Sequence, residues 1–159
     1  MALETIIKIA FEESINGKRQ GDKIDELKAI QSYIKSCQKI GVPNHDHVKT
    51  TVINPVLESF GLAPAENLQI HTSSADLTRM PAVTKALMAL DLYDLEMVIA
   101  RGRLGVPGSG SLLILMDNKG RILSAATSPP HILHHKNLKD AVRDEMIYAL
   151  ERIGLKVLK

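Results

Sequence analysis

The chain has 159 residues, 45% of them hydrophobic and 24% charged, a composition typical of one globular domain that argues against a disordered or fibrous protein. A formal net charge of +2 is too small for binding nucleic acid through bulk charge, and 3% of aromatic residues leave little material for stacking on bases. No run of about 18 residues lacks charges, which excludes a membrane span. The single cysteine, Cys37, can form neither an intrachain disulfide nor a thiolate metal site, so we expect a cytoplasmic protein.

Three helices are predicted in the first 60 residues. Apolar residues there recur at three- and four-residue spacing, and Gly, Asn and Pro separate the periodic stretches. We expect Asp22 to cap the second helix and Asn44 to cap the third, in which Pro55 should introduce a kink or a break. The three helices are expected at residues 6–16, 22–40 and 44–60.

From residue 67 onward, short apolar runs alternate with helical patterns. Pro81 suits the first turn of a helix, and residues 117–120 form a turn signal between two strands of a hairpin. The predicted strands cover residues 67–72, 95–100, 111–116, 121–126 and 155–158, and the predicted helices cover residues 81–90 and 138–153. The expected fold is one α/β nucleotide-binding domain over residues 1–159, with a mixed central sheet flanked by helices.

The segment Arg101–Ser111 is the first candidate site, because it is longer and richer in glycine than a hairpin connection requires. Successive amides in such a segment can form an anion-binding concavity, and arginine can hold phosphate through two hydrogen bonds. We therefore predict a phosphate or nucleotide site, with a merely flexible connection as the alternative. The predicted binding residues are Arg101, Gly102, Arg103, Gly105, Gly108, Ser109, Gly110 and Ser111.

The segment Thr72–Arg79 is the second candidate, because it joins a predicted strand to a predicted helix. Such connections commonly lie in the ligand crevice of an α/β sheet, where hydroxyls and helix amides can hold phosphate. Asp76 could hold Mg²⁺, and helix capping by Asp76 or Thr78 is the alternative. The predicted binding residues are Thr72, Ser73, Ser74, Thr78 and Arg79.

Two further groups carry ionisable side chains. Asp91, Asp94 and Glu96 precede a predicted strand, and carboxylates close to phosphates usually indicate Mg²⁺, although an ordinary polar turn explains them equally well. Three histidines lie between Ser128 and His135. They suggest acid–base chemistry or metal binding, but no acidic residue or cysteine lies beside them, and solvated histidines are the alternative.

Three strings of residues, Arg101–Ser111, Gly120–Ser124 and Ser128–His131, together resemble a methanogen family of guanylyltransferases. This family acts in the biosynthesis of the iron-guanylylpyridinol (FeGP) cofactor of [Fe]-hydrogenase. The likeness covers the chain by length and order of segments, and its specific motifs lie between Asp76 and His135. It implies a fold akin to inosine-triphosphate pyrophosphatase, a homodimer, and a reaction in which a substituted pyridinol attacks the α-phosphorus of GTP and pyrophosphate leaves.

That reaction suggests roles for the candidate residues. The two segments would hold the triphosphate together with Ser128, and a cation near them would stabilise the charge that grows on pyrophosphate. The residues assigned to catalysis are Arg103, Lys85 and His131, and those assigned to Mg²⁺ are Asp76 and Asp94.

Two other functions remain open from the residues. In a nucleoside-triphosphate pyrophosphatase, water would replace the pyridinol as the attacking group. In a non-catalytic nucleotide-binding or regulatory domain, the glycine-rich segment would hold a nucleotide without turnover. Rapid release of GMP from GTP alone would favour the first, and tight binding without reaction would favour the second.

Overall fold

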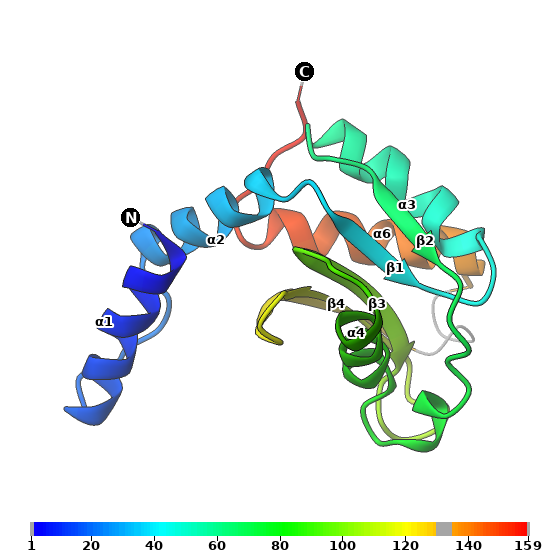
Figure 1. Cartoon of the computed structure of the whole chain (residues 1–159), viewed down its shortest axis with the longest axis horizontal. Helices are drawn as coiled ribbons and strands as arrows, with labels where there is room; N and C mark the ends of the chain where they lie inside the picture. Colours follow the sequence, from blue (N-terminus) through cyan, green and yellow to red (C-terminus); the bar gives the residue numbers. More distant parts are fainter. Residues whose placement is uncertain (1, 130–134, 159) are drawn as a thin grey trace.

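The computed structural model describes residues 2–129 and 135–158 and contains a five-stranded mixed sheet with helices on both faces (Figure 1). The strand order is β2-β1-β3-β4-β5, with β1 parallel to β2 and β3, and with β4 antiparallel to β3 and β5. The strands are β1 (Ile40–Pro43), β2 (Ala65–Leu68), β3 (Met97–Arg103), β4 (Ser111–Asp117) and β5 (Ile122–Ser128). The helices are α1 (Leu3–Ile15), α2 (Ile24–Ser36), α3 (Val48–Ser59), α4 (Pro81–Leu92) and α6 (Leu138–Glu151). The predicted α/β class with a mixed, helix-flanked sheet is therefore confirmed.

Each face of the sheet carries its own apolar core. Because side chains alternate along a strand, the nearly continuous apolar runs of β3 and β4 supply residues to both faces. Met97, Ile99 and Leu113 pack toward α3 and α6, whereas Val98 and Ile114 pack toward α4. In Figure 1, α1 extends away from the sheet and lies beside α2. Among the described residues, none of the helices combines the length and apolar character that a bilayer crossing requires.

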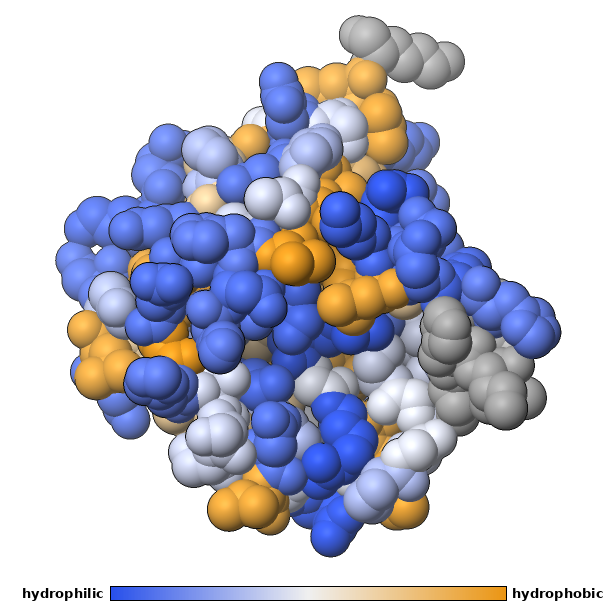
Figure 2. Space-filling model, turned by 90° about the vertical axis from the view of Figure 1, so that its right-hand side faces the viewer, coloured by the Kyte–Doolittle hydropathy of each residue, from blue (hydrophilic) through white to orange (hydrophobic). Residues whose placement is uncertain are grey.

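The topology indicates where a ligand would bind. The crossover through α3 leads from β1 outward to β2, and the crossover through α4 returns past β1 to β3. The order of the strands therefore reverses between β1 and β3, and α/β sheets bind ligands at the carboxyl ends of the strands at such a point. Three connections meet there: residues 44–47, the serine loop (residues 69–80) and the glycine loop (residues 104–110). Figure 2 faces this end of the molecule and shows a mostly hydrophilic surface.

The second predicted helix is too long. It ends at Ser36, and Ile40–Pro43 instead form β1, with all four residues buried between β2 and β3. Ile40 matches the helical spacing of the residues before it, and periodicity alone cannot distinguish so short an apolar run from the end of a helix. The missed strand is the central parallel strand of the sheet.

Other boundaries also differ from the prediction. Lys23 and His47, rather than Asp22 and Asn44, precede α2 and α3. Pro55 lies inside α3, which continues to Ser59 without a break; the neighbouring Asn54 side chain hydrogen-bonds both backbone groups of Ala65 and so fixes this turn of the helix to β2. The strand predicted at residues 67–72 is β2, which ends at Leu68, and residues 155–158 form no strand.

Candidate functional site

Arg101, at the carboxyl end of β3, is held by the buried carboxylate of Glu145 on α6. Its Nε donates to Glu145 Oε1 at 2.7 Å, and its Nη2 donates to Glu145 Oε2 at 3.1 Å and to Ser111 Oγ at 2.8 Å. The hydroxyls of Ser111 and Ser128 donate to the same Oε2 at 2.7 and 2.5 Å. The Glu145 side chain is 1% exposed and that of Arg101 is 14% exposed. Two predicted binding residues, Ser111 and Ser128, thus converge with Arg101 on one carboxylate.

Lys85 reaches the same strand from the opposite face of the sheet. Its Nζ donates to the carbonyl oxygen of Arg101 at 3.3 Å and lies 3.3 Å from Asp76 Oδ1. The Lys85 side chain is only 9% exposed, whereas that of Asp76 is 54% exposed. The ammonium group therefore lies between the backbone of β3 and a carboxylate of the serine loop.

Lys49, the second residue of α3, adds a third cation that sequence reasoning missed. Burial lowers the pKa of its ammonium group, and the positive charges of Lys85 and Arg101 lower it further. No other described residue forms a hydrogen bond or an ion pair with this side chain. A lysine at the start of a helix that directly follows a strand would have indicated a place in the site. Because β1 was not predicted, this signal could not be recognised. We refer to Lys49, Lys85 and Arg101 as the cationic cluster.

Arg103 connects the two candidate segments. Its Nε donates to the carbonyl oxygen of Gly105 at 2.8 Å, and its Nη1 and Nη2 donate to those of Asp76 and Thr78 at 3.1 and 3.0 Å. Arg79 adds a hydrogen bond from Nη1 to the same Gly105 oxygen at 3.2 Å. The structure therefore brings the serine loop and the glycine loop together. Nε, Nη1 and Nη2 of Arg103 all donate to backbone carbonyl oxygens of these loops.

Two glycines permit close approaches that define this edge. Gly102 lies in β3 rather than in the loop, and a Cβ atom there would lie 2.7 Å from the backbone nitrogen of Ala82 at the start of α4. Gly110 has φ +123°, and its Cβ would lie 2.2 Å from the carbonyl oxygen of Ser128. A side chain at either position would force α4 or the end of β5 away from the loop.

The remaining predicted binding residues lie in the two loops. Thr78 Oγ1 donates to the carbonyl oxygen of Ala75 at 2.7 Å, and Ser109 Oγ lies 2.6 Å from the carbonyl oxygen of Leu104. The capping alternative is wrong for α4, because Met80 precedes this helix and no side chain caps it. The serine loop contains a short 3₁₀ turn, whose amides bond to the carbonyl oxygens of residues 72–74. The predicted residues within the loops are Thr72, Ser73, Ser74, Thr78, Arg79, Gly105, Gly108, Ser109 and Gly110.

One predicted residue, Asp94, is not part of this arrangement. Asp94 precedes β3 and lies at the end of that strand opposite Arg103, where its 90% exposed side chain pairs with Lys39 at 2.8 Å. It cannot share a metal ion with Asp76, because the length of β3 separates the two carboxylates. His131 lies outside the described residues, and His135, which is described, is exposed.

The carboxylates present fit a nucleotide-bound Mg²⁺ better than a dedicated metal site. The described part of the chain holds no cluster of three or more His, Cys, Asp or Glu side chains arranged for a metal. Glu145 is fully engaged with Arg101 and two serines, which leaves Asp46 and Asp76 as the carboxylates that act on the cationic cluster, and Asp76 is the one that pairs with Lys85. Mg²⁺ commonly binds through one or two carboxylates, substrate phosphates and water.

Glu145 was also missed by sequence reasoning, although its spacing carries a signal. It lies three residues after Val142 and four before Ala149, both of which are buried, so the helical period places its carboxylate on the inward face of α6. A charged residue on an apolar helix face predicts a buried partner, but it does not predict which one.

The comparison with known families identifies the family of this chain. The family model of the FeGP cofactor biosynthesis protein HcgB, a guanylyltransferase, matches residues 3–155. The matched range includes every strand of the sheet, the cationic cluster and both loops. It confirms the guanylyltransferase predicted from the resemblance, and the chain belongs to the HcgB family of FeGP cofactor biosynthesis guanylyltransferases.

Proposed function

We propose that the cationic cluster binds the triphosphate of GTP while the guanylyl group passes to a substituted pyridinol. The observation that supports this proposal is the convergence of Lys49, Lys85 and Arg101 from three elements at the carboxyl ends of β1 and β3. The charges of Lys85 and Arg101 repel that of Lys49, and an anion bound beside Lys49 would relieve that repulsion. A triphosphate supplies several negative charges in one place.

The reaction requires positioning and charge stabilisation. The pyridinol oxygen forms a bond to the α-phosphorus, the bond from this phosphorus to the bridging oxygen breaks, and pyrophosphate leaves with that electron pair. The pyridinol proton passes to a base or to water. Because negative charge grows on the leaving pyrophosphate, fixed cations beside it lower the barrier. Lys85 and Arg101 suit this role, since neighbouring protein groups hold both side chains in place.

The contacts of Lys85 favour charge stabilisation over its predicted role as a base. Its Nζ donates to the carbonyl oxygen of Arg101 and pairs with Asp76, so both contacts use this side chain as a hydrogen-bond donor and a cation. A pyridinol hydroxyl is more acidic than an aliphatic alcohol, so a strong base is not required. The assignment of His131 as the group that orients or deprotonates this hydroxyl stays a prediction.

Mg²⁺ is part of the proposal, with Asp76 as its ligand on the protein. Bound with the nucleotide, the ion would neutralise part of the phosphate charge. Asp76 lies in the serine loop beside Lys85, and its side chain is accessible to a ligand at that surface. Its ion pair with Lys85 would then be exchanged for contacts with the metal.

A neighbouring cavity offers room for a planar ring. It has a volume of about 390 Å³, lies at the carboxyl ends of β1 and β2, and is lined by His45, Gln69, Ile70 and His71. The rings of His45 and His71 meet edge to face, with their centroids 6.4 Å apart. Flat heteroaromatic groups stack on such rings, so this cavity would take either the guanine base or the pyridinol.

The predicted homodimer also belongs to this proposal. α1 extends from the body of the molecule (Figure 1). It carries exposed apolar side chains, among them Phe11 (63% exposed) and Ile15 (66% exposed). A second copy would cover these side chains, and sedimentation of the purified protein would measure the mass. The fold kinship with inosine-triphosphate pyrophosphatase and the cytoplasmic location stay predictions.

The test is an incubation of the purified protein with Mg²⁺ and GTP, with and without a substituted pyridinol, followed by mass spectrometry. Pyrophosphate and a guanylylpyridinol that appear only when both substrates are present support the proposal. GMP in both samples would identify a pyrophosphatase instead. Binding of GTP without any product would favour the regulatory domain.

A further inference from the structure

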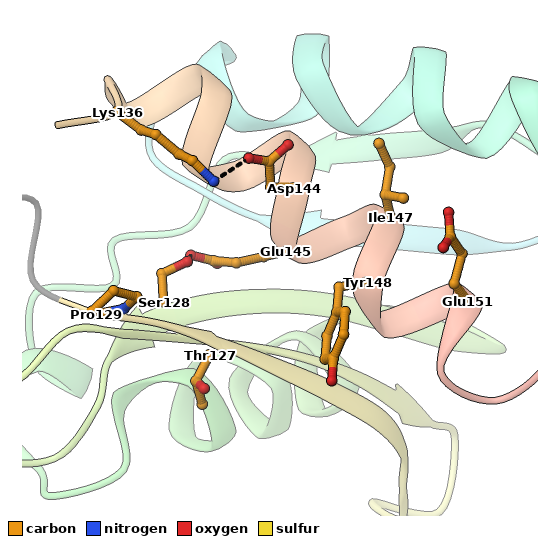
Figure 3. A pocket seen from close by; sticks show the side chains of 9 residues that line it. All are labelled: Thr127, Ser128, Pro129, Lys136, Asp144, Glu145, Ile147, Tyr148 and Glu151. Carbon is orange, nitrogen blue, oxygen red and sulfur yellow. Dashed lines mark hydrogen bonds and ion pairs between the residues drawn. The ribbon is translucent and has the colours of Figure 1, made fainter. Parts of the chain in front are cut away.

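Glu145 is the most heavily hydrogen-bonded carboxylate beside the proposed triphosphate site. Its two oxygens accept four hydrogen bonds: two from Arg101, one from Ser111 and one from Ser128. Figure 3 shows the side chain extending from α6 toward Ser128 at the end of β5, whereas Glu151 on the same helix points away from this contact. Three strands and one helix are thus joined through one buried carboxylate.

Stability alone does not account for this carboxylate. The other five buried residues of α6 are Ala141, Val142, Met146, Ala149 and Leu150, all of them apolar. Removing two charges from water is costly, and replacing a buried ion pair by well-packed apolar residues is often neutral or stabilising. The apolar packing of this helix therefore does not explain why a charged residue lies at this position.

The geometry of the pair fixes the orientation of the guanidinium group. Nε and Nη2 of Arg101 face the two oxygens of Glu145 in a two-point contact, and Ser111 accepts from Nη2 as well. Nη1 donates to no other described residue, so it is the nitrogen left for a ligand. A donor held in place before the substrate binds needs no reorganisation during the reaction, and it therefore stabilises the transition state more effectively.

We propose that Glu145 is a positioning residue that, with Ser111 and Ser128, orients Arg101 so that Nη1 donates to the transferring phosphate chain. The proposal rests on the proposed function, because it requires that Arg101 contact phosphate. Glu145 itself does not touch substrate, since both of its oxygens are occupied. Its effect is transmitted through the two-point contact with the guanidinium group.

The experiment is a double-mutant cycle on kcat/KM for GTP with Glu145→Gln and Arg101→Lys. Glutamine keeps the volume but not the charge, and lysine keeps the charge but not the planar fork. We expect each single variant to lose about 10- to 100-fold, mainly in kcat, as expected for an oriented group. The double variant should lose no more than about threefold beyond Arg101→Lys, because residues that act as one unit are not additive.

Each outcome identifies which idea fails. If the two losses multiply in the double variant, Glu145 does not act through Arg101 and the positioning role is wrong. If Arg101→Lys keeps full kcat/KM, the phosphate role of Arg101 itself is wrong.

Glu151→Gln is the control for a lost charge on α6, since Glu151 is exposed and should give wild-type kinetics. If Glu145→Gln does not fold, Ser128→Ala removes one hydrogen bond to the carboxylate and should lower kcat severalfold, and an unchanged kcat would overturn the proposal.

Discussion

Lys85 and Arg101 meet across the thickness of the sheet, with Nζ of Lys85 3.3 Å from the carbonyl oxygen of Arg101. Lys85 comes from α4 on one face, and the guanidinium group of Arg101 turns toward α6 on the other. The backbone of β3 therefore carries a cation on each side at its carboxyl end. Such an arrangement can surround an extended anion such as a triphosphate rather than touch it from one direction.

The first prediction concerns Lys85. Lys85→Met should reduce kcat by about 10²-fold or more, since it removes a fixed charge beside the leaving pyrophosphate. Lys85→Arg should recover part of the loss, because it keeps the charge in a different shape. Steady-state kinetics with GTP would measure both. Lys39→Met serves as the control, because Lys39 pairs with Asp94 at the distant end of β3 and should keep wild-type rates.

The second prediction follows from the lowered pKa of Lys49. The triphosphate binds the protonated ammonium, so KM for GTP should rise as the pH rises through this lowered pKa, below the ordinary value of 10.5. The Lys49→Arg side chain stays charged over this pH range, so the rise of KM with pH should disappear. KM measured between about pH 7 and 10 for both proteins tests this. The pyridinol titrates equally in both assays, so identical profiles would show that Lys49 does not hold the triphosphate.

Lys49 also gives a prediction for stability. Its folded-state pKa lies below its unfolded value, so the unfolded chain binds more protons between the two values, and the free energy of unfolding rises with pH there. Below that window the half-buried charge destabilises the fold. Lys49→Met should therefore raise Tm at neutral pH while it lowers activity. Calorimetry would detect the rise, and a fall in Tm would mean that the lysine stabilises the fold.

The sequence predicted the elements in which local pattern and tertiary context agree. Residues 138–153 have an apolar stripe of helical period, and α6 occupies 138–151. Residues 111–116 are apolar throughout, and β4 is buried between β3 and β5. β1 was missed because only four residues cross the sheet there, and they continue the spacing of the helix before them.

The same limit explains why Glu145 was missed. Arg101, Ser111 and Ser128 were predicted from their setting among Gly, Ser and Arg, and the structure does bring them together. Glu145 lies 44 positions from Arg101 in the chain, and only the packing of α6 on the sheet makes them neighbours. Asp94 is the opposite case. It is close in sequence to the glycine loop, so it was predicted to lie near that loop, but the extended strand β3 separates the two and Asp94 lies at the opposite end of this strand.

Asp76 gives a test of the metal proposal. Asp76→Asn removes a ligand charge, so the Mg²⁺ concentration needed for half-maximal rate should rise severalfold, with kcat largely recovered at saturating Mg²⁺. Because the change also removes the ion pair with Lys85, Asp94→Asn is the matched control for a lost carboxylate. A rate that falls equally at every Mg²⁺ concentration would assign Asp76 to holding Lys85 instead.

Arg103 provides the last prediction, because its contacts indicate a role different from direct phosphate binding. Its three hydrogen bonds hold the carbonyl oxygens of Asp76, Thr78 and Gly105, and thereby fix the serine loop against the glycine loop. Arg103→Ala should lower kcat/KM by about tenfold or more, since displaced loops no longer position the substrate. It should also raise amide hydrogen exchange in both loops, with little change in the sheet.

Arg103→Lys separates the two roles. A lysine keeps one positive charge but cannot bond three carbonyl oxygens in a plane, so it should behave like Arg103→Ala if the arginine acts by holding the loops. If Arg103→Lys keeps near-wild-type kinetics, the charge itself matters and Arg103 binds phosphate, as the sequence predicted. A turnover for Arg103→Ala within about twofold of wild type would exclude both roles, because either one requires the side chain for catalysis.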